Sequence, residues 1–226
     1  MNPSARLGPR LNLILDLIML AQQQKRYSVI WDCCCDHGYL GIKILQKDLC
    51  NRLVFVDQLA HIIEQLTDKL TPYNTGKYSL ITADAGDLNL NHLQNNLVII
   101  AGVGVETTIQ IINSIEVNHP GLQIDYIICT STIKKSLREY LSKNKFGLLA
   151  ENLVCENKRY YEVLYVRGGA TGDLSSSSSL SSQPLPGVPL DCNLWDVNNM
   201  DHQRFLEKIN RPRLSKKPKR KIIRSE

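Results

Sequence analysis

Apolar positions along the chain alternate between short strand-like runs and segments with helical spacing. Strand patterns lie at Val29–Cys33, Arg52–Asp57, Tyr78–Thr82, Leu97–Ala101 and Tyr126–Thr130. Helical periodicity covers 9–24, Gly38–Asp48, Ala60–Leu70, Thr107–Ile115 and Ile133–Lys143. The run Leu97–Ala101 is wholly apolar, which is typical of a strand covered on both faces. The alternation predicts an α/β domain with a mostly parallel sheet.

The pattern changes after residue 146. Two strand-like runs, Leu148–Glu156 and Tyr160–Val166, are joined by only three residues. A parallel crossover needs a dozen residues or more, so we expect an antiparallel hairpin here. Five β/α units closed by a hairpin predict a Rossmann-like class I methyltransferase fold. A dehydrogenase of the doubly wound class would more often end with another β/α unit.

The last quarter of the chain differs in composition from the rest. Residues 168–190 are rich in Ser and Pro, which predicts a flexible linker after a domain that covers 1–167. Residues 191–226 are expected to hold one short helix and a basic disordered tail. Residues 204–226 carry ten basic and two acidic side chains, whereas residues 1–203 carry 17 basic and 20 acidic ones. This asymmetry indicates a polyanionic partner bound by the tail.

Composition also limits the cellular setting. The apolar run at 13–21 is too short for a membrane span and is interrupted by Asp16. The seven cysteines lack the spacing of a secreted disulfide framework, so a cytoplasmic protein is expected. A monomer is the simplest expectation for its assembly.

Carboxylates follow three consecutive predicted strands, at Asp32 or Asp36, at Asp57 and at Asp84. The carboxyl ends of parallel strands line one crevice. S-adenosyl-L-methionine has an ammonium, a ribose diol and an adenine amino group, all of which can donate hydrogen bonds to carboxylates. Asp57 suits the ribose and Asp84 the adenine. A dinucleotide pyrophosphate would be repelled, and the G-x-G-x-x-G pattern is absent.

Several of these residues allow a simpler interpretation. Asp57 could cap the following helix, and His37 could be a turn histidine bonded to backbone. The cysteines at 33–35 next to His37 suggest a metal site, but no second cluster with ligand spacing accompanies them, so no metal is predicted. No motif ties a histidine to a cysteine nucleophile either.

The stretch Asp32–Gly41 resembles the first motif of the bacterial tRNA (adenine-N1)-methyltransferases that modify adenine 22. It reads Asp-Cys-Cys-Cys-Asp-His-Gly-Tyr-Leu-Gly, where the family has roughly Asp-x-Gly-Ser-Asp-His-Ala-Tyr-Leu-Pro. The similarity extends to Asp84, to Ile100–Gly104, to Tyr160–Val163 and to Arg10-Leu11. This chain has Cys34 and Val105 at two family glycines, Thr-Ser-Thr in place of Gln-Pro-Asn after the fifth strand, and no counterpart of the family's C-terminal coiled-coil domain.

The resemblance implies an S-adenosylmethionine-dependent enzyme that methylates an unpaired or extruded adenine of tRNA at N1. The predicted catalytic residues are Asp36, which would accept from the base amino group, and Tyr39, which would stack on the base. The predicted cofactor-binding residues close strands one to four: Asp32, Cys34, Asp36, His37, Gly38, Asp57, Gln58, Asp84, Ala85, Ala101 and Gly102. The alternative interpretations are that Tyr39 packs within its helix and that Asp36 binds the cofactor ammonium.

A rival hypothesis is a degenerate methyltransferase fold that binds RNA or acts as a scaffold without turnover. Cys34, Val105 and the missing Gln-Pro-Asn favour it, while the retained aspartates and His37 oppose it. In either case tRNA is the expected partner, held by the tail and by the mouth of the crevice.

Overall fold

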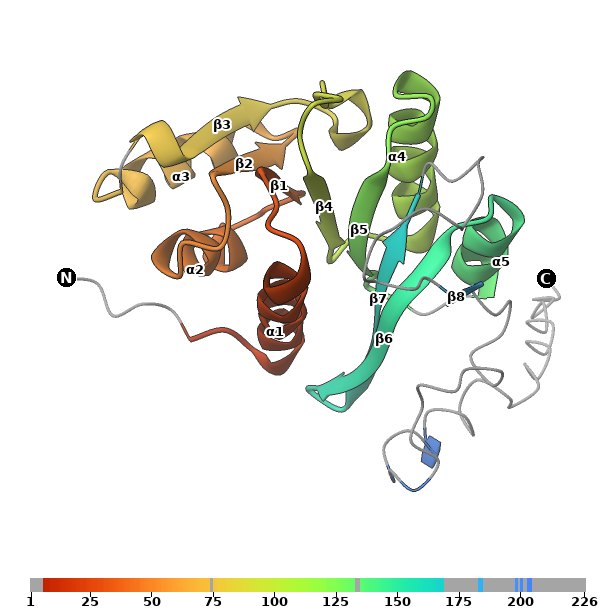
Figure 1. Ribbon diagram of the computed structural model, residues 1–226. Coiled ribbons are helices and arrows are strands. Elements are labelled where there is room, and N and C mark those ends of the chain that lie inside the picture. The colour runs from red at the N-terminus through yellow and green to blue at the C-terminus, as the bar shows by residue number, and fades with distance from the viewer. Residues whose placement is uncertain are drawn as a thin grey trace, which may run out of the picture.

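The computed structural model of the chain describes residues 6–73, 75–132, 135–168, 183–184, 198, 200 and 203–204. One mixed sheet with strand order β3-β2-β1-β4-β5-β7-β6-β8 runs through these residues (Figure 1). Its strands are β1 Val29–Cys33, β2 Arg52–Asp57, β3 Tyr78–Thr82, β4 Asn96–Ala101, β5 Ile124–Cys129, β6 Gly147–Glu156, β7 Arg159–Arg167 and β8 Gln183–Pro184. The helices are α1 Pro9–Gln24, α2 Tyr39–Gln46, α3 Ala60–Leu70, α4 Val105–Asn118 and α5 Lys135–Lys143.

Strands β1 to β5 are parallel, and β7 pairs antiparallel with both β5 and β6. This arrangement confirms the predicted Rossmann-like methyltransferase fold and its closing hairpin. The turn of the hairpin holds two residues, Asn157 and Lys158, both at positive φ (51° and 62°). Such a two-residue turn matches the twist of the strands that it joins.

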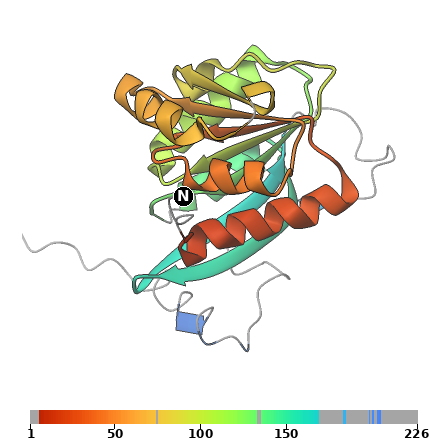
Figure 2. The same ribbon diagram turned by 90° about the vertical axis from the view of Figure 1, so that its left-hand side faces the viewer.

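The sheet separates two apolar layers. Because side chains alternate between the faces of a strand, Leu97 and Ile99 pack on one side of β4 and Val98 and Ile100 on the other. Helices α1, α2 and α3 cover the first face, whereas α4 and α5 cover the second (Figure 1). Turned by 90°, the molecule shows α1 lying along the β6–β7 hairpin (Figure 2).

The element boundaries differ from the predicted ones in a few places. The predicted helices at 38–48 and 107–115 extend from Tyr39 to Gln46 and from Val105 to Asn118. Between β3 and β4 the chain makes a single 3-10 turn, η2 Ala85–Asp87, in place of a complete helix. The short polar segment 83–95 lacks the helical run of apolar positions that would cover the sheet.

Most of the predicted linker and tail lies outside the described residues. Within the linker, Gln183 and Pro184 pair with Leu148 and Gly147 at the start of β6. The short helix and basic tail that were predicted within residues 191–226 are otherwise not described. No helix in the described part of the chain is long and apolar enough to cross a membrane.

Candidate functional site

The turn between β1 and α2 contains several residues in the left-handed backbone region. Cys34, Asp36 and Gly38 all have positive φ values, of 56°, 47° and 69°. A Cβ at Gly38 would clash with the Leu66 side chain, so only glycine fits without a shift. The turn is attached to β2 because the Asp36 N–H donates to Asp57 Oδ2 at 3.3 Å.

Asp32 is buried near the end of β1, with 4% of its surface exposed. Its Oδ2 accepts one hydrogen bond, from the Gly41 N–H at 3.1 Å. Burial raises the pKa of the Asp32 carboxyl to about 7, the Gly41 bond partly offsets this rise, and the nearby Asp57 charge adds to it. A cation placed beside Asp32 would therefore stabilise its ionised form.

Asp57 and Asp84 lie at the next two strand-to-loop connections. Asp57 Oδ1 accepts from the Leu59 N–H at 3.1 Å, and Asp84 Oδ1 accepts from the Gly86 N–H at 2.7 Å. The interpretation of Asp57 as a helix cap holds only in part. Asp57 accepts from the N–H of Leu59, the residue before α3, but the N-cap position itself is Leu59, whose side chain makes no capping hydrogen bond. Both carboxylates keep acceptor capacity for another group.

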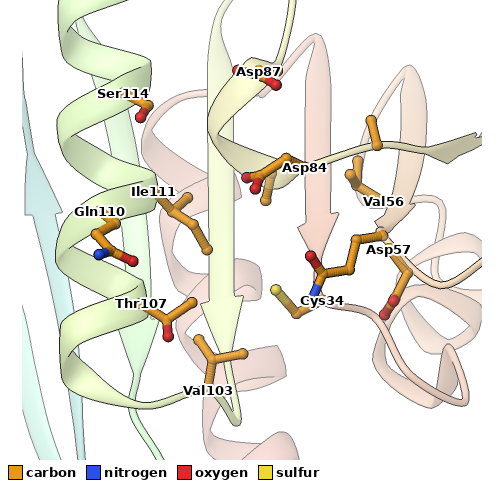
Figure 3. A pocket seen from close by; sticks show the side chains of 13 residues that line it. Cys34, Val56, Asp57, Asp84, Asp87, Val103, Thr107, Gln110, Ile111 and Ser114 are labelled. Carbon is orange, nitrogen blue, oxygen red and sulfur yellow. The ribbon is translucent and has the colours of Figure 1, made fainter.

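Asp57 and Asp84 line the same cavity, of about 340 Å³, on the α4 side of the sheet (Figure 3). The cavity is bounded by the ends of β1 to β4 and by one face of α4, and its lining residues are Cys34, Val56, Asp57, Gln58, Ala83, Asp84, Ala85, Asp87, Val103, Thr107, Gln110, Ile111 and Ser114. The mixture of apolar walls and carboxylates suits a nucleoside. We call this space the α4 cavity.

A second cavity, of about 360 Å³, adjoins it on the other face of the sheet. It is lined by Arg10, Leu11, Asp32, Cys34, Cys35, Asp36, His37, Tyr39, Leu40, Ala101, Gly102 and Val103. We call this space the α1 cavity. Cys34 and Val103 line both cavities. The strand ends thus line two adjoining cavities that share Cys34 and Val103, in place of the single crevice that was predicted.

The likeness to a known family extends over the whole domain. A family model described as a methyltransferase domain matches residues 7–164, which include every strand end described above. The chain belongs to this methyltransferase domain family.

Curated and solved relatives resemble this methyltransferase domain. A Mycoplasma pneumoniae protein named "Putative tRNA methyltransferase" is 28% identical over 159 residues, covering 70% of each chain. The structure of M. capricolum TrmK with S-adenosyl-homocysteine has a TM-score of 0.60 at 22% identity and covers 75% of this chain and 74% of that one. The B. subtilis m1A22 tRNA methyltransferase TrmK has a TM-score of 0.63 at 19% identity, covering 73% and 67%. At these identities the two structures establish the fold alone.

The predicted cofactor-binding residues of the methyltransferase domain divide between the cavities. Gln58 and Ala85 line the α4 cavity, whereas His37, Ala101 and Gly102 line the α1 cavity. Gly38 lines neither cavity and instead precedes the first residue of α2.

The two predicted catalytic residues are both accessible. The Asp36 side chain is 71% exposed, and Tyr39 is 40% exposed. The centroid of the Tyr39 ring lies 5.4 Å from that of the His37 ring and 5.3 Å from Lys69 Nζ. The Tyr39 ring is thus partly exposed and contacts the His37 ring.

Sequence reasoning missed the contribution of α4. Thr107, Gln110, Ile111 and Ser114 face the strand ends from this helix (Figure 3). Their spacing of three, four and seven residues is the signature of one helix face, directly after the Gly102–Gly104 loop. That signal was present in the sequence and could have identified them.

The cysteines of the turn are protonated at neutral pH. Burial raises the pKa of the Cys34 thiol to about 11, and the Asp57, Asp32 and Asp84 charges contribute to the rise. Burial also raises the pKa values of Cys33 and Cys35. Thiols of this kind are poor nucleophiles. Among the described residues, no group of three His, Cys, Asp or Glu has the geometry to hold a metal.

Proposed function

We propose that this methyltransferase domain uses S-adenosyl-L-methionine to methylate N1 of an adenine in tRNA, with adenine 22 as the expected position. Three observations support the proposal: the family membership, the names of the relatives, and the two adjoining cavities lined by carboxylates. The protein is expected to act in the cytoplasm, where such a substrate is found, as a monomer.

The donor set at the strand ends fits the cofactor. Asp57 and Asp84 in the α4 cavity can accept hydrogen bonds from a ribose diol and an adenine amino group, and Gln58 and Ala85 lie beside them. Asp32 in the α1 cavity is a buried carboxylate with a pKa of about 7, which a cationic group would lower. The placement of Asp57 and Asp84 in one cavity and of Asp32 in the cavity beside it is the single observation that carries the proposal, because it brings three carboxylates to the ends of adjacent strands.

S-adenosylmethionine, when bound, supplies an electrophilic methyl group. The residues of the chain contribute alignment and a shielded site. Tyr39, partly exposed at the rim of the α1 cavity, presents a ring on which an extruded base can stack. Asp36 presents a carboxylate beside it that can accept from the base amino group. Together they would hold the adenine N1 in line with the methyl group.

The rival function, a binding or scaffold module without turnover, is not favoured. It rested on Cys34 and Val105 at family glycines and on Thr130–Thr132 in place of Gln-Pro-Asn. Cys34 lines both cavities without closing either one, and Val105 is buried in the core as the first residue of α4. Neither substitution removes a carboxylate from the site.

The basic tail is proposed to supply general affinity for tRNA. Residues 211–224 hold eight Lys and Arg and no acid, whereas residues 1–203 have a net charge of −3. Lys and Arg contacts to phosphate add affinity and salt dependence without reading the base sequence. A chain shortened to residue 203 should therefore bind tRNA more weakly, with a shallower salt dependence, and retain its affinity for S-adenosylmethionine.

The test of the proposed function is methyl transfer to tRNA transcripts, followed by nucleoside mass spectrometry. We expect 1-methyladenosine to appear, and to disappear when adenine 22 is replaced by guanine. Methyl transfer to another adenine would assign a different target position. Binding of both S-adenosylmethionine and tRNA without any methyl transfer would favour the scaffold function.

A further inference from the structure

The β6–β7 hairpin extends beyond the rest of the sheet at the edge that holds the site. Strand β7 pairs with β5 only from Leu164 onward, so residues 159–163 lie past Ile128, the last paired residue of β5. At about 3.3 Å per residue, the hairpin projects roughly 15 Å beyond that point. We call residues 152–163 the hairpin arm. It lies beside the first turns of α1 (Figures 1 and 2).

The hairpin arm is attached to the wall of the α1 cavity. Glu156 Oε1 accepts from the Arg10 N–H at 3.3 Å, and Glu156 Oε2 lies 3.7 Å from Arg10 Nε. The Arg10 guanidinium also lies 5.1 Å from the centroid of the Tyr161 ring. A Cβ at Gly8 would clash with Glu156 Oε1, so α1 and the arm approach closely. The arm is thus held in place relative to the site.

The tip of the arm is basic. Lys158 and Arg159 are both exposed, and neither has an ion-pair partner among the described residues. The two cavities are lined by Asp36, Asp57 and Asp84, whose charges would repel an approaching phosphate backbone. Positive charge on the arm and negative charge in the cavities separate two tasks: the cavities suit a cation, and the arm suits a polyanion.

We propose that the hairpin arm is a phosphate-binding surface that holds the RNA backbone next to the target nucleotide. Lys158 and Arg159 would contact the backbone from the arm, which Arg10 joins to the wall of the α1 cavity. The proposal rests on the proposed function, since it assumes an RNA substrate. It assigns the arm a local role at the reacting base, distinct from the general affinity of the tail.

The test compares two double variants of the full-length chain. In K158Q/R159Q the slope of log affinity for tRNA against log salt should become shallower by about 1.8, because each basic side chain that neutralises a duplex phosphate adds about 0.9 to that slope. The KM for tRNA should rise about tenfold, since two phosphates are no longer neutralised. Affinity for S-adenosylmethionine should not change, and the charge-preserving variant K158R/R159K should keep the salt slope of the unmodified chain.

The matched control is K143Q/K145Q. Lys143 and Lys145 are exposed lysines just before Gly147, where β6 begins, whereas the arm holds the residues with which β6 ends. This variant therefore removes the same charge at the end of the strand away from the site. We expect it to leave the salt slope and the KM close to those of the unmodified chain. An equal effect of both double variants, or no effect of either, would overturn the proposal. A failure of the proposed function is distinguishable, because the unmodified chain would then transfer no methyl group to tRNA.

Discussion

Two aspartates are buried at opposite ends of the same sheet, and only one of them is neutralised by the described part of the chain. Asp125, at the start of β5, is fully buried and accepts from Arg167 Nε at 2.6 Å and Nη2 at 2.9 Å. It also accepts from the Tyr27 hydroxyl at 2.6 Å, and Lys25 Nζ lies 3.8 Å away. Burial, together with the Asp125 charge, raises the pKa of Tyr27, so the phenol stays protonated as a donor.

Asp32 lies near the carboxyl end of β1, and its hydrogen-bond and charge partners differ from those of Asp125. It accepts one backbone N–H, and the charge that acts on it is that of another carboxylate, Asp57. A carboxylate that stabilises the fold thus differs from one that is available to a ligand. Asp125 is part of a closed network that the fold completes, whereas Asp32 is left to be neutralised by a proton or by an incoming cation.

The largest expected effect is on the closed network. Asp125→Asn leaves the Arg167 guanidinium buried without its carboxylate, so the free energy of unfolding should fall by about 3–5 kcal/mol. Urea denaturation followed by circular dichroism measures this change. A fall below about 1 kcal/mol would mean that Asp125 contributes no more than a surface ion pair.

The next effect concerns the binding carboxylates. Asp84→Ala should weaken the binding of S-adenosylmethionine by about 1–3 kcal/mol, because a hydrogen-bond acceptor for the adenine is removed. Isothermal titration calorimetry gives the affinity, and Asp68→Ala, an exposed acid on α3, is the control. Equal affinities of the two variants would place the adenine elsewhere.

Asp32→Asn should raise the free energy of unfolding, whereas Asp125→Asn should lower it. At pH 8 the variant should be more stable by about 1–2 kcal/mol, since it removes a buried charge and keeps an acceptor for the Gly41 N–H. The folded carboxyl keeps its proton up to about pH 7, whereas the unfolded one loses it near 3.8, so stability of the parent falls as pH rises across that window. Unfolding curves between about pH 4 and 8 should show this fall in the parent and not in the variant.

The smallest effect is expected at Cys34. Cys34→Gly removes a side chain from a left-handed position, and the gain is offset by the greater freedom of glycine in the unfolded chain, so stability should change by no more than about 1 kcal/mol. The junction of the two cavities becomes wider, and affinity for S-adenosylmethionine should rise. A marked fall in affinity would show that the thiol itself contacts the cofactor.

The two ends of the sheet were not equally predictable from the sequence. Strand ends that carry Asp32, Asp57 and Asp84 follow β-branched runs, and parallel strands bring such ends to one edge. The closed network could not be predicted, since Tyr27 and Asp125 are 98 positions apart and no local pattern links them. Arg10 is a similar case: its place in the α1 cavity depends on how α1 packs on the hairpin, which is a tertiary result.

The central claim is that Asp32 awaits a cation carried by S-adenosylmethionine. Calorimetric titration of the ligand at a pH of about 6.5, in two buffers with different heats of ionisation, tests it most directly. We expect binding with release of up to one proton, because a neighbouring cation lowers the Asp32 pKa from about 7, and we expect no such release in Asp32→Asn. Absence of binding, or binding with the same proton count in both proteins, would contradict it.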